Sequence, residues 1–123
     1  MRNIVLLMLR KPVAQGLISN LEGIPEIRLF YENDYSKASN LIYKNNANIA
    51  LVEIAETGEY DVYYCLALCA KLRMSKCKLL LLCPEQDEST IAAAVNAKQK
   101  GYIEDFIFYD ASIDYLASKL LAT

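Results

Sequence analysis

Five short apolar runs, separated by stretches with helical periodicity, constrain this chain more than any other feature of its sequence. The runs are rich in Ile, Leu, Val or Phe and are bounded by polar or turn-forming residues, which is typical of β-strands. They cover residues 3–9, 26–31, 48–54, 77–83 and 105–109. The first, third and fourth runs are apolar nearly throughout, which predicts strands covered on both faces in a parallel sheet.

The segments between these runs carry apolar residues at helical spacing. Strict alternation of strands and helices predicts an α/β fold in which right-handed crossovers place helices on both faces of a parallel sheet. No linker, repeat or low-complexity stretch interrupts the pattern, so we expect one domain over residues 1–123. The five helical stripes contain Val13, Leu17, Ile18 and Leu21; Ala38, Leu41 and Ile42; Val62, Cys65, Leu66, Cys69 and Leu72; Ile91, Ala94 and Val95; and Ile113, Leu116, Ala117 and Leu120.

The composition narrows the class of protein. Hydrophobic residues make up 54% and charged residues 23% of the chain, which is too apolar for intrinsic disorder. The net charge of −2 argues against direct binding to nucleic acid or to an anionic membrane. The one basic cluster falls near an expected helix end, where cations complement the helix dipole; it contains Lys71, Arg73, Lys76 and Lys78. No run approaches the roughly 20 apolar residues of a membrane helix and no secretory signal is present, so we expect a cytoplasmic protein.

Cysteine and histidine usage excludes several kinds of site. The chain has four cysteines and no histidine. Ser-His catalysis and a mixed Cys/His zinc site are therefore excluded, and no Cys-x-x-Cys pair is present. Cys65 and Cys69 lie one helical turn apart within an apolar stripe. We expect both thiols to pack in the core, as free cysteines commonly do.

A five-unit open sheet most often has the strand order 2-1-3-4-5, with a ligand crevice at the carboxyl ends of the first and third strands. Glu53 is the candidate for chemistry there, because it is an acid at the end of a buried strand. Its expected neighbours at the same edge of the sheet are Met8, Leu9, Arg10, Ile54, Cys83, Pro84, Glu85, Tyr109 and Asp110.

These patterns resemble the response-regulator receiver domain (CheY-like) of two-component signal transduction, and the resemblance covers the whole chain. The segment "NIALVEI" (48–54) is similar to the receiver strand "D-L-V-L-L-D-I", which places Glu53 at the phospho-acceptor aspartate. The segment "NIVLLMLR" (3–10) resembles the strand that ends in two acids, with Met8 and Leu9 at the acid pair. The resemblance implies a flavodoxin-like (βα)5 three-layer sandwich.

Two further segments extend the resemblance towards the C-terminus. In "KLLLLCP" (78–84), Cys83 stands where receivers carry Thr or Ser. The segment "GYIEDFIFYD" (101–110) is similar to "G-A-D-D-Y-L-V-K-P", which places Phe106 at the switch aromatic and Tyr109 at the lysine. The chain stops directly after its last expected helix, as the N-terminal receiver of a longer regulator would.

The departures from the receiver pattern remove the groups that phosphoryl transfer needs. Mg²⁺ takes oxygen ligands, which Met8 and Leu9 lack. Tyr109 is neutral where the family has a cationic lysine, and Cys83 is a weak hydrogen-bond donor where the family has a hydroxyl. We therefore expect a receiver-like domain that is not phosphorylated, with no catalytic residue, no metal and no cofactor.

Glu53 itself has two interpretations at this stage. Its extra methylene group pushes the carboxylate outward, so it would imitate a phosphorylated aspartate and hold a switched-on shape. Alternatively it is a solvated or paired acid, with Arg10 as its partner, and carries no regulatory content. A structure with Glu53 far from Arg10 and pointing into solvent would exclude the pairing.

Two other chemistries compete for the same crevice. Glu56, Glu59 and Asp61 follow Glu53 and would form a cation site if the fold brought them together. The alternative function is a small flavodoxin-like enzyme or cofactor-binding protein that uses Cys83 or these acids. Against it, the first strand–helix turn, "MLRKPVAQG", lacks a phosphate-binding pattern, and the acids after Cys83 disfavour a low thiol pKa.

If the crevice has no chemical role, we expect the domain to act through a surface that binds other proteins. In receivers the usual dimerisation or output face is built from helix four, strand five and helix five. Here helix four reads "STIAAAVNAKQK" (89–100), and its stripe predicts that Ala93 and Ala97 lie on the outer side with Lys100. We expect a signal-transduction or transcriptional response-regulator domain that forms a homodimer or binds a protein partner through this face.

Overall fold

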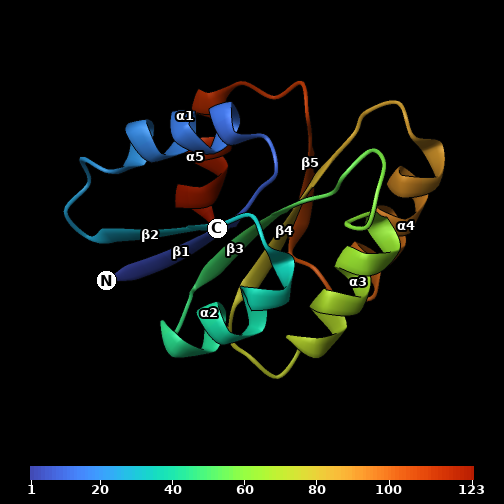
Figure 1. Ribbon diagram of the computed structural model, residues 1–123, viewed down its shortest axis with the longest axis horizontal. Helices are drawn as coiled ribbons and strands as arrows, with labels where there is room; N and C mark the ends of the chain where they lie inside the picture. Colours follow the sequence, from blue (N-terminus) through green and yellow to red (C-terminus); the bar gives the residue numbers. More distant parts are fainter.

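The chain forms a five-stranded parallel sheet between two layers of helices, as the alternating pattern predicts (Figure 1). The computed structural model describes all residues, 1–123. The strands are β1 (Arg2–Leu7), β2 (Ile27–Glu32), β3 (Ile49–Glu53), β4 (Lys78–Cys83) and β5 (Asp105–Phe108). The helices are α1 (Lys11–Leu21), α2 (Ala38–Lys44), α3 (Val62–Lys71), α4 (Glu88–Gln99) and α5 (Ile113–Ala122), and a 3₁₀ turn, η1 (Tyr35–Lys37), precedes α2.

The strand order is β2-β1-β3-β4-β5, which confirms the predicted topology. Leu7, the last residue of β1, pairs with Val52 in β3, and Glu53 pairs with Leu82 in β4. The carboxyl ends of β1 and β3 are therefore neighbours. Because the helix after β1 and the helix after β3 cover opposite faces of the sheet, a crevice between the two strand ends is expected here.

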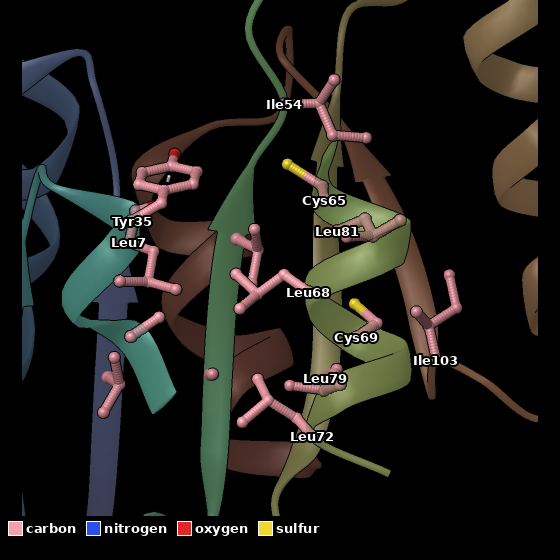
Figure 2. Close-up of a cluster of buried hydrophobic side chains, with 14 of the residues drawn as sticks. Leu7, Tyr35, Ile54, Cys65, Leu68, Cys69, Leu72, Leu79, Leu81 and Ile103 are labelled. Carbon is pink, nitrogen blue, oxygen red and sulfur yellow. Dashed lines mark hydrogen bonds between the residues drawn. The ribbon is translucent and has the colours of Figure 1, made fainter. Parts of the chain in front are cut away.

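The helices divide into two layers with separate hydrophobic cores. α1 and α5 cover one face of the sheet, and α2, α3 and α4 cover the other (Figure 1). Gly16 lets α1 approach α5 closely, since a Cβ atom there would lie 3.1 Å from Ile113. On the other face, Cys65 and Cys69 are buried on the side of α3 that faces the sheet, as predicted (Figure 2).

Short polar side chains start the later helices. The Asp61 carboxylate accepts a hydrogen bond from the Tyr64 amide at 2.9 Å, and Asp87 accepts one from the Thr90 amide at 3.2 Å. Such caps satisfy amides that have no partner inside a helix. None of the helices combines the length and the apolar character that a membrane-spanning segment requires.

Helix α4 is rotated relative to the predicted orientation, although Ala94 faces the core as expected. Its buried residues are Thr90, Ala94 and Ala97, whereas Ile91 and Val95 are only half-buried. The sequence interpretation followed the larger apolar side chains, whereas the buried side of α4 consists of smaller residues. The prediction that Ala97 lies on the outer surface is therefore wrong, and Ala93 packs partly against the core. Only Lys100 of that predicted patch is exposed.

Candidate functional site

The Glu53 carboxylate is buried at the switch point between β1 and β3 and is completely engaged within the chain. The residue is 1% exposed. Its Oε1 atom accepts hydrogen bonds from the amides of Leu9 and Arg10, at 2.8 and 3.0 Å. Its Oε2 atom forms an ion pair with Nε of Arg10. The predicted pairing with Arg10 is confirmed, and the interpretation of Glu53 as a solvated acid is excluded.

The loop after β1 is shaped to hold this carboxylate. The two amides that bind Oε1 belong to consecutive residues, so the backbone of the turn into α1 presents two donors to one oxygen. Arg10 is also the residue that precedes the first helical position of α1. A buried carboxylate with two amide donors and a guanidinium partner has the compensation that a buried charge requires.

Arg10 lies between the Glu53 carboxylate and the ring of Tyr109. The central carbon of its guanidinium group is 3.8 Å from the centroid of that ring, which is a cation–π contact. The Tyr109 hydroxyl donates a hydrogen bond to the carbonyl of Ile54, directly after β3. Burial raises the pKa of Tyr109, so its phenol stays protonated and neutral. We refer to Glu53, Arg10 and Tyr109 as the crevice triad.

Tyr35 fills the crevice from the other face of the sheet. Its buried hydroxyl lies 2.8 Å from the carbonyl oxygen of Leu7 and 2.6 Å from that of Glu53, so it joins the ends of β1 and β3. Its ring stacks on Tyr60, with the centroids 4.1 Å apart. Figure 2 shows the Tyr35 ring beside Leu7, near the end of β1. Burial raises the pKa of Tyr35 far above its ordinary value, so this hydroxyl is a hydrogen-bond donor at any physiological pH.

Tyr35 is a residue that the sequence interpretation missed. It lies in the three-residue turn η1, which has no periodicity of its own. The neighbouring Asp34 gave the only local indication, because its side chain accepts from the Ser36 amide and so starts the turn. That pattern predicts a turn but not the burial of the tyrosine within it.

The remaining predicted residues do not assemble into a reactive centre. Met8 and Cys83 are buried, and Leu9 is exposed. Burial raises the pKa of the Cys83 thiol to about 12, so it is protonated and not nucleophilic at neutral pH. Glu53 makes no hydrogen bond to Cys83, at the end of the neighbouring strand β4, or to the hydroxyl of Tyr109, which follows β5.

The residues present do not fit the Mg²⁺ ion that the receiver resemblance implies. Glu53 supplies the single carboxylate at the switch point, and both of its oxygens already have partners. Met8 and Leu9 offer no oxygen ligand from their side chains. Glu56 and Glu59 are exposed on the following loop, and Asp61 caps α3, so the structure does not bring these acids together with Glu53. No group of three or more acidic or cysteine side chains is arranged to hold a metal ion.

Comparison with known proteins agrees on the fold. Neither a protein-family model nor a characterised protein sequence matches this chain. Solved structures do match. A LuxR-family DNA-binding response regulator from Staphylococcus aureus has a TM-score of 0.78 at 14% identity, over 99% of this chain and 98% of that one.

Two further matches span the chain in the same way. A two-component response regulator from Clostridium difficile has a TM-score of 0.77 at 20% identity, over 99% of this chain and 94% of that one. A CheY-like protein (tadZ) from Pseudomonas aeruginosa PAO1 has a TM-score of 0.70 at 17% identity, over 99% and 98%. At such identities the likeness concerns the fold, so the conclusion is that this chain has the flavodoxin-like (βα)5 fold of CheY-like receiver domains.

Proposed function

We propose that residues 1–123 form one receiver-like signalling domain in which an internal ion pair replaces the phosphorylation site. The observation that carries the proposal is the complete engagement of Glu53. Both carboxylate oxygens are bonded to the loop after β1, and the carboxylate is inaccessible to solvent. A carboxylate attacks a phosphoryl group through an accessible oxygen, and the burial and existing partners of both Glu53 oxygens disfavour that attack.

The surroundings of Glu53 support the same proposal. The cation beside it is Arg10, which is held by the carboxylate itself and by the ring of Tyr109. The loops after β3 and β4 form a hollow whose lining includes the acids Glu56, Glu85 and Asp87. These charges repel an anionic phosphodonor. The engagement of Glu53 towards the β1 loop, away from Cys83, also favours a structural ion pair over an imitation of phosphoaspartate.

The domain then acts by binding another protein, and the face formed by α4, β5 and α5 is the surface we propose. β5 is an edge strand, and Phe106 and Phe108 on it are half-buried. Both line a shallow hollow together with Tyr115 of α5. Partly exposed aromatic side chains of this kind are enriched in protein–protein interfaces. This face would bind a second copy of the chain or another protein. We place the domain in the cytoplasm because all four cysteines are free.

This hypothesis differs in detail from the one drawn from the sequence. The aromatic side chains Phe106, Phe108 and Tyr115 now form the centre of the proposed face. Ala97 lies on the buried side of α4 and takes no part in this face. Lys100 is exposed next to the end of α4.

The test of the non-phosphorylated state is incubation with a small phosphodonor and Mg²⁺, followed by intact-mass measurement. We expect no adduct on the native protein. An adduct on Glu53 that is stoichiometric and depends on Mg²⁺ would contradict the proposal. The interface is tested by sedimentation at several concentrations, comparing the native chain with Phe108→Asp, and a native chain that stays monomeric and binds no partner through this face argues against it.

A further inference from the structure

Near β3 and β4, the loops at the carboxyl ends of the strands and the loops at their amino ends carry opposite charge. At the carboxyl edge, the loops 54–61 and 84–88 contain six acids and no lysine or arginine. We call these residues the acidic rim: Glu56, Glu59, Asp61, Glu85, Asp87 and Glu88. Because parallel strands all end at the same edge, both loops lie on the same side of the molecule.

At the opposite end of the sheet, six exposed cations lie at the ends of α2, α3 and α4, in the turn after α3 and at the start of β4. We call them the basic rim: Lys44, Lys71, Arg73, Lys76, Lys78 and Lys100. Glu104 lines a hollow with Arg73, Lys76 and Lys78, and Glu32 lines another with Lys44. No member of either rim takes part in an ion pair within the chain, since the salt bridges join Arg10 with Glu53, and Asp105 with Lys98 and Lys119.

The ends of the helices do not account for all of this charge. Asp61 and Asp87 cap α3 and α4, and Lys44 and Lys71 lie in the last turns of α2 and α3. Such residues complement the helix dipole, whose effect is confined to the first and last turns. The other members lie outside those turns or are not needed for capping, and they include Glu56, Glu59, Glu85, Arg73, Lys76 and Lys78.

Each rim borders hollows in the surface. The turn 72–77 borders two hollows, and Ser75 and Lys76 line both of them. Met74 in this turn is 83% exposed, and Tyr43 and Tyr102 are exposed beside the hollows. Three members of the acidic rim, Glu56, Glu85 and Asp87, line a cavity of about 430 Å³ together with Thr57, Pro84 and Gln86.

We propose that the acidic rim of one copy of this chain binds the basic rim of a second copy. The turn 72–77 of the second copy would enter the acidic cavity, with Arg73 and Lys76 against Glu56 and Glu85. The charge complementarity between the two ends of the same molecule identifies the occupant, because each rim provides the unpaired charges that the other lacks. The four residues of this contact lie outside α4, β5 and α5, and the proposal does not depend on the proposed function.

The arrangement has two physical consequences. The two rims lie at opposite edges of the sheet, so the contact is heterologous and repeats into an open chain instead of closing as a dimer. The contact consists mainly of exposed charges, each of which contributes little. Association is therefore weak and steeply dependent on salt, since the screening length falls from roughly 30 Å at 0.01 M to about 3 Å at 1 M.

The experiment is sedimentation equilibrium of the native chain at low and high salt. Protein concentrations reach about 1 mM, at which even a complex with a millimolar Kd is substantially formed. We expect the average mass to rise beyond that of a dimer at low salt and to return to the monomer or dimer at high salt. A chain that shows no such salt-dependent increase overturns the proposal.

Two charge-reversed variants make the test specific. Arg73→Glu with Lys76→Glu alters the basic rim, and Glu56→Lys with Glu85→Lys alters the acidic rim; all four side chains are exposed and unpaired. Each variant alone should lose the low-salt increase in mass. An equimolar mixture should regain association, because each variant keeps the rim that its partner needs. A mixture that stays unassociated contradicts the proposed pairing.

The matched control is Lys11→Glu with Lys37→Glu, which makes the same change in net charge at exposed positions outside the basic rim. It should associate like the native chain. Loss of association in this control would assign the effect to net charge and overturn the assignment to the rims. A dimer through the α4–β5–α5 face would instead persist at high salt and in both rim variants. The experiment therefore distinguishes failure of the rim contact from failure of that dimer. If the chain binds soluble polyglutamate but does not self-associate, the basic rim binds another acidic partner. That result would contradict the proposal that a second copy of the chain binds there.

Discussion

Two carboxylates in this molecule are held by cations, and they differ in how the rest of the chain supports them. Glu53 at the crevice is 1% exposed and has two amide donors in addition to Arg10. Asp105 at the start of β5 has a side chain that is 22% exposed, and it pairs with Lys98 at 2.9 Å and with Lys119 at 2.6 Å. Two backbone amides of a distant loop hold Glu53, whereas Asp105 is held by the amide of its neighbour Phe106, at 2.8 Å, and by two flexible lysine side chains.

This difference indicates which of the two carboxylates can be separated from its cations at the lower cost. Separating Glu53 from Arg10 would leave a charge buried at the switch point, which is strongly unfavourable. Separating Asp105 from its lysines would leave three groups that water can reach. The crevice is therefore the rigid part of the domain, and the link that Asp105 makes between α4 and α5 is the part that a binding partner can rearrange.

The largest expected effect comes from Arg10→Ala. Removing one partner of a buried pair costs about 3–5 kcal/mol, and we expect roughly 2–4 kcal/mol here because the Arg10 side chain is 38% exposed. Urea unfolding measures the loss. The double variant Arg10→Ala with Glu53→Gln should be more stable than Arg10→Ala alone, since no unpaired charge remains. A loss below roughly 0.5 kcal/mol, as at ordinary surface sites, would show that the two sites do not differ as described.

Tyr35→Phe gives the next largest effect and separates the neutral hydrogen bonds of the crevice from the ion pair. The substitution removes a hydroxyl that serves two buried carbonyl groups, so we expect a loss of about 1–3 kcal/mol in the free energy of unfolding. Tyr63→Phe is the matched control, because Tyr63 is exposed and its hydroxyl has no partner. Equal stability of the two variants would show that the Tyr35 hydroxyl contributes nothing.

Asp105→Asn should have a smaller effect that depends on salt. Its two lysine partners are exposed enough to be screened, so we expect about 0.5–1.5 kcal/mol at low ionic strength and less at high salt. The loss caused by Arg10→Ala should change little with salt. Unfolding measured at two salt concentrations therefore compares the two carboxylates directly, and the same salt dependence at both sites would contradict the comparison.

The pH dependence of Asp105 sharpens the comparison further. Partial burial acts to raise its pKa, but hydrogen bonds from Lys119 and Lys98 outweigh that effect and hold the pKa at about 2, below the ordinary value of 3.8. A lowered pKa stabilises the folded state above pH 4, and this contribution is lost as the pH falls from about 4 to about 2. Unfolding of the native chain and Asp105→Asn should therefore differ less at pH 2 than at pH 5. If the difference in the free energy of unfolding is the same at pH 2 and pH 5, the ionisation of Asp105 does not cause it.

The smallest expected effect concerns the thiols. Burial raises the pKa of Cys65 further than that of Cys69, Cys77 and Cys83, which reach about 12. A thiol reagent at neutral pH should modify the folded chain slowly and should modify all four cysteines rapidly in denaturant. Fast labelling of Cys83 in the folded chain would show that the crevice opens, and would make it less rigid than the comparison requires.

The alternation of apolar runs and helical stripes was sufficient to predict the strand order, because few topologies accommodate five βα units. It also predicted that Glu53 stands at the switch point with Arg10 near it. The phase of α4 was predicted wrongly, since the sheet there favours small side chains over the larger Ile91 and Val95. The placement of Tyr35 and the stacking of Arg10 on Tyr109 depend on contacts between distant segments, which local patterns do not encode.

The most direct test of the central claim is an NMR titration of the native chain with Mg²⁺ and beryllofluoride, which binds a competent acceptor carboxylate as a phosphoryl analogue. The amides of Leu9 and Arg10 and the Arg10 Nε–H group report on the Glu53 carboxylate, because all three donate to it. The account predicts that these three resonances stay unchanged and that the Nε–H proton exchanges slowly with solvent. Saturable shifts that require both Mg²⁺ and beryllofluoride would contradict it.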